Sequence, residues 1–355
     1  MAIPSSLWVP REVIRWGILG CGDVTEVKSG PGFQKAEGSQ LVAVMRRNAA
    51  LAEDYARRHG VTKWYADADA LIRDPAVDAV YVATPPGSHL ELALKVAAAG
   101  KPCHVEKPMA RQAAECDKMI AAFARARMPL FVAYYRRAQP RFLKAKELIE
   151  TSLGCVTHVH YQFTDARHAA AAGSLPWRLD AENAGGGFFL DLGSHTLDLL
   201  DFFFGPLVDV AGHAANLASP YAVEDTLGMS FRTPAGAPGT AAWNFAGAVK
   251  KTEDYFQITG TNGRLTFSTF GSEPLKLESA DGKVEEFSFP TLPHVAQPLI
   301  QTVVDELRGR GKCPSPGETA ARTTRVMDRV LDSYYGGRAD DFWKRAATWP
   351  GRRKG

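Results

Sequence analysis

The first third of the chain alternates short apolar runs with segments of helical periodicity, and this alternation constrains the fold more than any other feature. Between Val13 and Tyr134 the apolar runs are VIRWGIL, QLVAVM, DAVYVAT, KPCHVE and LFVAYY. The stretches between them, such as 49–59 and 89–99, carry apolar residues at helical spacing. Several runs are apolar on both faces, which is typical of parallel strands covered by helices on both sides. We therefore expect an α/β fold with a doubly wound parallel sheet over residues 1–135.

The pattern changes after Arg137. Helix-like segments at 140–151 and 187–204 enclose the strand-like run VTHVHYQF, and residues 207–289 read as strands and turns. Thr-Asn-Gly at 261–263 lies where the turn of a β-hairpin would be. These features predict an α+β domain with an antiparallel sheet over residues 136–317. We expect the Ala-rich stretch 166–174 to be a mobile loop.

Charge and cysteine content narrow the class of partner. The chain has 42 Lys and Arg against 39 Asp and Glu and contains no long basic block, which argues against a nucleic-acid partner and favours a small molecule. Five cysteines without a close pair fit neither a disulfide framework nor a metal cluster, so we expect reduced thiols, a cytoplasmic location and no metal. No run is long and apolar enough for a membrane helix, and MAIPSSLWVP does not resemble a secretory signal.

A glycine-rich turn follows the first predicted strand. In a dinucleotide-binding turn, the first glycine permits the sharp bend and the second lets the pyrophosphate approach the backbone. Gly20 and Gly22 occupy these positions, and we expect the following Asp23 and Val24 to contact the dinucleotide too. The third small position is Thr25, and VKSGPG after it is a poor helix, so the match to the motif is incomplete. An ordinary tight turn is the alternative, and the turn's place in an alternating array favours the cofactor.

The end of the second predicted strand bears on the choice of cofactor. NAD-binding folds usually place Asp or Glu there to bind the ribose hydroxyl, whereas this chain has Arg46 and Arg47. Two guanidinium groups can hold the 2′-phosphate of NADP through charge-assisted hydrogen bonds. We therefore expect NADP in preference to NAD, and the alternative is that both arginines are solvated surface charges.

The runs DAVYVAT and KPCHVE also end at the carboxyl edge of the predicted doubly wound sheet, where ligands bind. We expect the cofactor to contact residues of both ends, namely Thr84, Pro85, His89, Glu106 and Lys107. A lysine at this edge can be partly desolvated and can donate to a substrate oxygen. A surface lysine before a proline turn remains an alternative interpretation of Lys107.

Asp191 and His195 are four residues apart in the helix-like segment 187–204. On a helix they would share one face, which suits a carboxylate that orients an imidazole. A pair that only stabilises the helix is the alternative. The imidazole is of interest because its ordinary pKa of about 6.5 suits an acid/base group near neutral pH.

These segments together resemble the Gfo/Idh/MocA oxidoreductases, which include inositol, glucose-fructose and dihydrodiol dehydrogenases. The resemblance covers most of the chain and is carried by GILGCGDV, TPPGSH, Glu106-Lys107-Pro108 and GGGFFLDLGSHTLDLL. The Glu-Lys-Pro triplet followed by Asp-x-Gly-x-His is far more specific than the glycine turn. Thr25 and Arg46 depart from the commonest pattern, and Arg46 argues against strict use of NAD.

The resemblance implies an N-terminal Rossmann domain joined by a C-terminal helix at about 318–345, and an open, mostly antiparallel sheet that often mediates dimer contacts. It implies Lys107, Asp191 and His195 as the catalytic set, with Tyr135, Trp177, Arg178 and Asp191 near the substrate. We expect a homodimer or homotetramer that transfers hydride between NADP(H) and a sugar, polyol or cyclitol. His195 would be the acid/base and Lys107 would polarise the substrate oxygen, although family members differ over which of the two makes the proton transfer.

Three other functions stay open at this point. The substrate could be an aromatic trans-dihydrodiol or an anhydro sugar, since Trp177, Tyr134, Tyr135 and Phe163 would suit stacking on either. The chain could also be a non-catalytic NADP-binding sensor, because a fold alone does not define a reaction. The combination of lysine, aspartate and histidine opposes a sensor, which needs no acid/base group.

Overall fold

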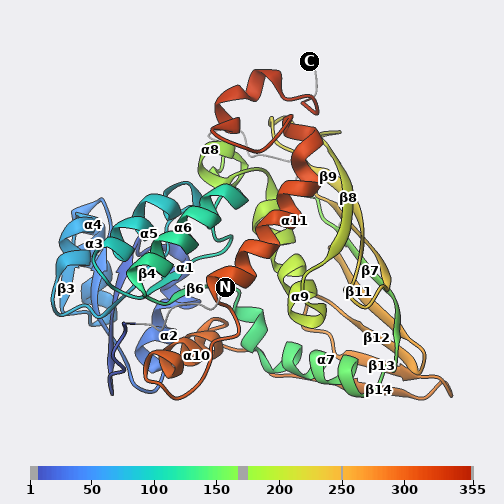
Figure 1. Cartoon of the computed structure of the whole chain (residues 1–355), viewed down its shortest axis with the longest axis horizontal. Helices are drawn as coiled ribbons and strands as arrows, with labels where there is room; N and C mark the ends of the chain where they lie inside the picture. Colours follow the sequence, from blue (N-terminus) through green and yellow to red (C-terminus); the bar gives the residue numbers. More distant parts are fainter. Residues whose placement is uncertain (1–6, 167–174, 249–250, 353–355) are drawn as a thin grey trace. The chain divides into compact units, whose positions relative to one another are not determined.

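The structure is a computed structural model that describes residues 7–166, 175–248 and 251–352. The Ala-rich stretch at 166–174 therefore lies almost entirely outside the described residues. The chain forms two compact units (Figure 1). Unit 1 comprises the described residues of Met1–Gln139 and Leu292–Ala321, and unit 2 those of Pro140–Thr291 and Arg322–Gly355.

Unit 1 contains a six-stranded parallel sheet, which confirms the predicted doubly wound α/β architecture. The strand order is β3-β2-β1-β4-β5-β6. The strands are β1 (Ile14–Leu19), β2 (Ser39–Met45), β3 (Lys63–Tyr65), β4 (Ala79–Val82), β5 (Cys103–Val105) and β6 (Leu130–Val132). The helices are α1 (Asp23–Val27), α2 (Gly30–Lys35), α3 (Ala49–His59), α4 (Ala68–Arg73), α5 (His89–Ala98), α6 (Ala113–Ala126) and α10 (Gln297–Leu307).

Two cores cover the two faces of this sheet. Alternate residues of one strand enter opposite cores, as Tyr81 and Val82 of β4 do. Helices α4, α5 and α6 contribute to the core that contains Val82, and α2, α3 and α10 contribute to the core that contains Tyr81. This burial on both sides explains why the strands are apolar throughout.

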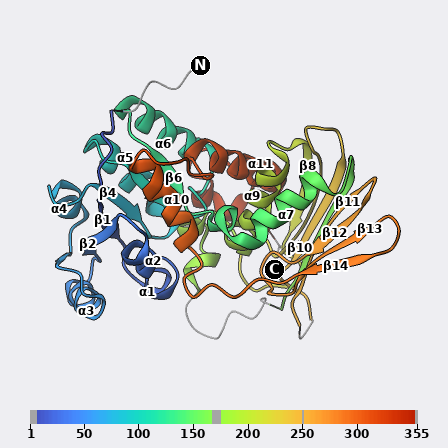
Figure 2. The same cartoon turned by 90° about the horizontal axis from the view of Figure 1, so that it is seen from below.

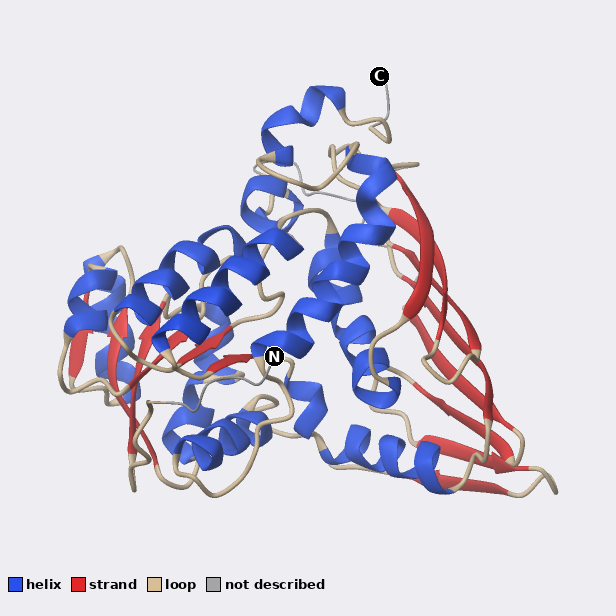
Figure 3. Cartoon of the chain, in the orientation of Figure 1, coloured by secondary structure: helices blue, strands red, loops and turns tan. Residues whose placement is uncertain are grey.

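Unit 2 contains an eight-stranded sheet in the order β14-β13-β12-β11-β7-β10-β9-β8 (Figure 3). Its strands are β7 (Val156–Thr164), β8 (Val208–Ala215), β9 (Thr226–Arg232), β10 (Pro238–Asn244), β11 (Glu253–Gly260), β12 (Gly263–Phe267), β13 (Leu275–Ser279) and β14 (Val284–Phe287). Only the β7–β10 pair is parallel among these strands, so the mostly antiparallel sheet is confirmed. The predicted hairpin joins β11 to β12, with Gly260 opposite Gly263.

The helices of unit 2 pack on one face of its sheet. They are α7 (Pro140–Thr151), α8 (Ala181–Ala184), α9 (Ser194–Phe204) and most of α11 (Gly317–Tyr335). Their apolar side chains form one core with the inward residues of the strands, such as Tyr161 and Trp243. The alternate positions His160 and Gln162 of β7 lie on the other face, which we call the outer face. Figure 2 gives a second view of the strands.

The chain returns to unit 1 earlier than the sequence predicts. We expect a helix at about 318–345 to rejoin the first domain, whereas residues Leu292–Ala321 do so in the structure. The reason is that the apolar face of α10 enters the core of unit 1 around Phe33. Helix α11 begins with Ala320 and Ala321 in the core of unit 1 and continues with Met327 and Val330 in the core of unit 2.

Three further findings concern the described residues. No helix among them has both the length and the apolarity that a membrane crossing requires. Their His, Cys, Asp and Glu side chains include no group of three or more placed to hold a metal ion. All five cysteines are free thiols, and only Cys155 is exposed.

Candidate functional site

The predicted cofactor residues of unit 1 gather at the carboxyl edge of the parallel sheet. Backbone hydrogen bonds extend the strand pairing past the strand ends and hold the following loops side by side. The amides of Gly20 and Cys21 both donate to the carbonyl of Met45, at 2.8 and 3.1 Å. The Ala83 amide donates to Leu19 and the Glu106 amide to Val82, both at 2.8 Å. Ligands bind at this edge in doubly wound sheets.

The glycine turn has the geometry that a pyrophosphate requires. Gly20 has a φ of +87°, and a Cβ there would lie 2.6 Å from Cγ2 of Thr84, so a side chain is excluded both by conformation and by space. A Cβ at Gly22 would meet nothing closer than 3.9 Å, so the backbone at Gly22 borders open space. The described residues therefore fit a dinucleotide at this turn.

Thr25 replaces the small third residue of the motif without disrupting the turn. Its hydroxyl donates to the Gly22 carbonyl and accepts from the Gly22 amide, at 2.8 and 2.9 Å. Its carbonyl accepts from the buried Tyr55 hydroxyl at 2.8 Å. Helix α1 ends at Val27, and α2 begins at Gly30, where a Cβ would lie only 2.1 Å from the Thr25 carbonyl oxygen. The poor helix signal after the turn thus corresponds to two short helices.

Arg46 follows β2 directly and lies beside the glycine turn. Its amide donates to the Tyr65 carbonyl at 3.1 Å, and its side chain is half-buried. Burial raises the pKa of the Cys21 thiol to about 11, and the positive charge of Arg46 acts in the opposite direction. Arg46 directly follows Met45, whose carbonyl accepts from the amides of Gly20 and Cys21, so its backbone lies beside the turn. Arg47 is exposed.

Lys107 lies at the end of β5 and is half-buried. Its amide donates to Oε2 of Glu106 at 3.0 Å, and Oε1 of the same carboxyl accepts from the Tyr81 hydroxyl at 2.5 Å. Burial raises the pKa of Glu106, although Lys107 and the Tyr81 hydroxyl oppose this effect. Glu106, which we expect to contact the cofactor, thus has both carboxylate oxygens bonded to groups of the protein.

His89 lies inside the fold, which corrects the expectation that it contacts the cofactor. The side chain is fully buried, with Nε2 2.7 Å from the Thr84 carbonyl oxygen and Nδ1 3.2 Å from that of Met109. Burial lowers the pKa of His89, although both carbonyls oppose this. The ring joins the loop after β4 to the loop after β5. Thr84 and Pro85 are half-buried at the edge itself.

The two tyrosines after β6 differ in accessibility. Tyr134 is fully buried in the core of unit 1, so it is not available for stacking on a substrate. Tyr135 is half-buried, and the Arg136 guanidinium lies over its ring at 5.0 Å. Phe163 belongs to the core of unit 2 and is 2% exposed. Of the aromatic residues expected to suit stacking, Tyr135 and Trp177 are the accessible ones.

The predicted substrate residues of unit 2 form one connected group. Nε of Arg178 donates to Oδ2 of Asp191 at 3.0 Å, and the Arg178 guanidinium lies 4.5 Å from the centre of the Trp177 ring. Trp177 is 38% exposed. This hydrogen bond joins Asp191 to a residue 13 positions earlier in the chain. The expected pairing of Asp191 with His195 stays a prediction. An aromatic ring, a guanidinium and a carboxylate together can recognise a polar ring-shaped molecule.

His195 begins the first turn of α9 and is 4% exposed. The edge of its ring contacts Phe270, with ring centres 5.9 Å apart. The segment before α9, Phe189–Gly193, is a π-helix that contains Asp191. π-helical turns are rare in proteins, and those that occur often lie at functional sites. A Cβ at Gly193 would lie 2.1 Å from the Phe189 ring, so this turn requires glycine.

The glycine triplet 185–187 has a packing role that the sequence does not reveal. Gly185 ends α8 with a φ of +86°. The Gly187 amide donates to Oε1 of Glu224 at 2.9 Å, and a Cβ at Gly187 would lie 2.4 Å from the Glu224 carbonyl oxygen. Glu224 is fully buried and also accepts from the Tyr335 hydroxyl. Burial raises the pKa of Glu224.

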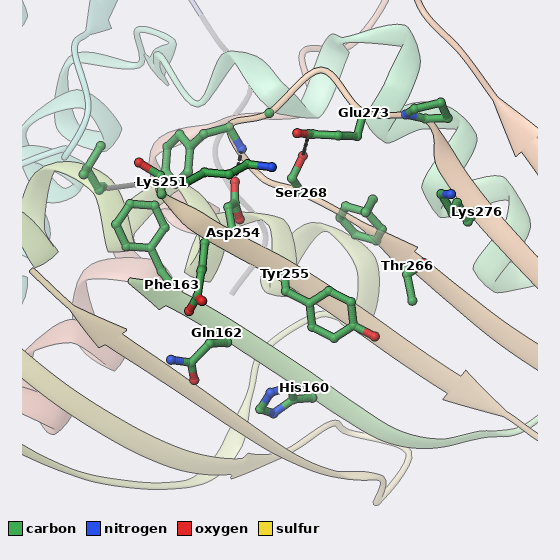
Figure 4. A pocket seen from close by; sticks show the side chains of 17 residues that line it. His160, Gln162, Phe163, Lys251, Asp254, Tyr255, Thr266, Ser268, Glu273 and Lys276 are labelled. Carbon is green, nitrogen blue, oxygen red and sulfur yellow. Dashed lines mark hydrogen bonds between the residues drawn. The ribbon is translucent and has the colours of Figure 1, made fainter. Parts of the chain in front are cut away.

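Unit 2 also contains a cavity of about 1380 Å³ (Figure 4). Its walls include the polar outer-face residues His160, Gln162 and Tyr255, and the charged residues Lys251 and Asp254. Leu192, next to Asp191, and Phe270, which contacts His195, line it too. The cavity therefore borders the π-helix Phe189–Gly193 and the ring of Phe270, which contacts the predicted acid/base residue.

Comparisons with known proteins agree with this architecture. The family profile described as "Oxidoreductase family, NAD-binding Rossmann fold" matches residues 14–134, and the profile "GFO/IDH/MocA C-terminal domain" matches residues 142–266. Oxidoreductase P35 of Formosa agariphila is 37% identical over 319 residues, which cover 89% of this chain and 97% of that protein. The trans-1,2-dihydrobenzene-1,2-diol dehydrogenase of Sus scrofa is 28% identical over 79% of this chain and 81% of its own length.

Among solved structures, levoglucosan dehydrogenase in complex with NADH and levoglucosan has a similar fold. Its TM-score is 0.81 at 22% identity, over 90% of this chain and 96% of that one. The family match and the strand order together identify an oxidoreductase with an NAD-binding Rossmann domain. The chain belongs to the Gfo/Idh/MocA oxidoreductase family.

Proposed function

We propose that this protein is an NADP(H)-dependent oxidoreductase that interconverts a secondary alcohol and a ketone of a sugar, polyol or cyclitol. The observation that carries the proposal is the group in unit 2 formed by Trp177, Arg178 and Asp191 next to the helix of His195. An exposed aromatic ring beside a charged pair suits a hydroxylated ring, and the imidazole supplies an acid/base group. The levoglucosan dehydrogenase with a similar fold supports a sugar-like substrate.

The proposed reaction moves one hydride and one proton. In the oxidative direction the carbinol C–H bond and the O–H bond break, and a C=O bond forms. A nicotinamide dinucleotide held at the carboxyl edge of the unit 1 sheet would supply the hydride acceptor. His195 takes the hydroxyl proton and returns it in the reductive direction. Lys107 donates to the same oxygen and stabilises the charge that develops on it, and Asp191 binds the substrate or orients the imidazole.

Within unit 1 we assign the dinucleotide to the carboxyl edge of the sheet. Gly20, Gly22, Asp23 and Val24 would hold its pyrophosphate, and Thr84 and Pro85 would border it. Arg46 and Arg47 would bind the 2′-phosphate. The half-buried position of Arg46 beside the turn supports NADP over NAD.

Replacing Lys107 tests its role directly. We expect Lys107→Met to lower kcat at least about 100-fold, because the methionine cannot donate to the substrate oxygen. The dissociation constant for NADPH, measured by nicotinamide fluorescence, should stay within about threefold of the wild-type value. Steady-state assays with a panel of sugars, inositols and diols measure the rate.

Lys95→Met is the matched control, since Lys95 lies on the surface of the same unit and pairs with Glu91 at 3.1 Å. It should keep the wild-type rate. A Lys107→Met variant with a near wild-type rate would remove Lys107 from the chemistry.

A second candidate substrate is an aromatic trans-dihydrodiol. It is favoured by the similarity to the porcine dihydrodiol dehydrogenase and by the accessible ring of Trp177. Including such a diol in the same panel separates the candidates by their kcat/KM values. Trp177→Ala should lower kcat/KM for the true substrate about tenfold or more, since stacking on the ring is lost.

We also propose that the protein forms a homodimer or homotetramer in the cytoplasm. Five free thiols support a reducing compartment. The outer face of the unit 2 sheet supports self-association, because it combines partly buried polar residues with the ring of Tyr255, which is 42% exposed.

A further inference from the structure

A buried chain of hydroxyl and carboxyl groups crosses unit 1 from the glycine-turn helices to Lys107. It begins at Ser29, which lies between α1 and α2. The Ser29 hydroxyl donates to the Val24 carbonyl at 3.2 Å. Oγ of Ser29 lies 3.2 Å from the hydroxyl oxygen of Tyr81, on β4. That hydroxyl in turn lies 2.5 Å from Oε1 of Glu106, whose Oε2 accepts from the Lys107 amide. Three segments that bear the predicted cofactor and catalytic residues are thus joined by side chains.

These hydrogen-bonded groups lie inside the protein. Ser29 and Tyr81 are at most 1% exposed, and Glu106 is 8% exposed. A buried hydrogen bond to a carboxylate is stronger than one in water, and the loss of one partner leaves a polar group unsatisfied. The position of Glu106 therefore depends on the Tyr81 hydroxyl.

Counting hydrogens shows that the contacts depend on the charge of Glu106. With the carboxyl ionised, two hydroxyl hydrogens serve three contacts, those to Glu106, Ser29 and Val24. The Tyr81 hydroxyl hydrogen is used in the 2.5 Å contact with Glu106. Only the Ser29 hydroxyl hydrogen then remains, and it can serve either the contact with Tyr81 or the bond to the Val24 carbonyl. With the carboxyl protonated, Glu106 donates to Tyr81, Tyr81 to Ser29 and Ser29 to the carbonyl, and all three contacts are made. A proton on Glu106 thus changes the hydrogen bonding as far as the helix after the glycine turn.

We propose that Tyr81 is a positioning residue that acts through Glu106 to hold Lys107 for catalysis, and that Ser29 connects this arrangement to the dinucleotide turn. The proposal rests on the catalytic role proposed for Lys107. It assigns Glu106 to the support of the Lys107 backbone instead of to a direct cofactor contact.

The groups that face this network define its pH dependence. Lys107 and Lys28 act on Glu106 electrostatically, and Tyr81 donates to it. The ring of His104 stacks on Tyr81 with centres 5.3 Å apart, and Tyr55 lies close enough to act on its hydroxyl. Burial raises the pKa of Glu106, and the Tyr81 hydroxyl lowers it. Removing that hydroxyl should therefore raise the pKa of Glu106 further.

Tyr81→Phe is the test, because it keeps the ring and deletes only the hydroxyl. We expect kcat to fall about tenfold or more, with KM for NADPH within about twofold. The acidic limb of the kcat/KM profile should move up by about one pH unit, because an unsupported carboxylate holds its proton more tightly. Glu106→Gln is the second variant. Its carbonyl oxygen can accept from the Lys107 amide while its NH₂ group donates to the Tyr81 hydroxyl, so it mimics the protonated carboxyl and cannot titrate. We therefore expect kcat to fall without such a shift.

The matched control is Tyr65→Phe, which also removes a phenol-to-carboxylate hydrogen bond in unit 1. The Tyr65 hydroxyl donates to Asp74 at 2.8 Å, and Asp74 is also held by Lys63. This variant should leave the profile unchanged.

A readout without turnover separates this proposal from the proposed function. The Glu106 carboxyl can be titrated by ¹³C NMR in protein without cofactor, with its signal assigned by its loss in Glu106→Gln. We expect its midpoint to rise by about one pH unit in Tyr81→Phe. An unchanged midpoint, or an unchanged kcat in the folded variant, would overturn the role of Tyr81. A shifted midpoint together with full activity of Lys107→Met would instead contradict the proposed function.

Discussion

Arg46 is the residue on which the coenzyme preference depends. Its backbone is fixed by the hydrogen bond to Tyr65, and its side chain is half-buried next to the turn that contains Cys21. A guanidinium held there can form bidentate hydrogen bonds with a phosphate, whereas NAD offers only hydroxyl groups at the same point.

We therefore expect Arg46→Asp to weaken NADPH binding about 100-fold and to change NADH binding only a few-fold. Titrations followed by nicotinamide fluorescence give both dissociation constants. Arg73→Asp, at the exposed end of α4, makes the same charge change away from the turn and should affect neither coenzyme. Equal weakening of both coenzymes by Arg46→Asp would mark Arg46 as a general surface charge.

The sequence predicts which residues lie at the strand ends better than it predicts whether their side chains are buried. The sequence predicts Gly20 and Arg46 at the edge because each follows a strand of a parallel sheet, and both lie there in the structure. His89 and Tyr134 are buried, and nothing in their spacing distinguishes a residue that lines a site from one that fills the core. The sequence does not reveal the hydrogen bond of Tyr81, because its partner Glu106 is 25 residues away.

At the scale of elements, the segment before α9 is held by contacts that require glycine. The Gly187 amide binds the buried Glu224, and a Cβ would collide with the Glu224 backbone. The sequence predicts one helix over 187–204, whereas the structure has a π-helix at Phe189–Gly193 before α9. Periodicity cannot reveal this change, because it depends on close contacts such as that of Gly193 with Phe189.

Gly187→Ala should lower the free energy of unfolding by about 2 kcal/mol or more, because the new methyl group has no space. Urea denaturation followed by circular dichroism measures the change. Gly228→Ala in β9 is the control, since a Cβ there meets nothing within 4 Å, and it should be neutral or slightly stabilising. Equal stability of the Gly187→Ala variant and the wild type would show that Glu224 can shift.

At the scale of the whole molecule, the proposed self-association places a specific demand on the outer face. Tyr255→Glu should shift the protein towards the monomer, because a buried, unpaired carboxylate at an interface is unfavourable. Light scattering coupled to size exclusion measures the mass. Leu94→Glu, on α5 of unit 1, introduces the same charge at a partly exposed apolar position and should leave the mass unchanged. If Tyr255→Glu leaves the mass unchanged, the part of the outer face around Tyr255 is not a subunit interface.

The path of the chain between the two units has a consequence for its biosynthesis. The first part of unit 1 ends at Gln139, yet α10, which covers the core around Phe33, begins only at Gln297. At a translation rate of roughly 5 to 20 residues per second, the ribosome needs on the order of ten seconds or more to reach it. During that time the emerging polypeptide presents an uncovered apolar surface, which makes it a natural client for chaperones that bind nascent chains.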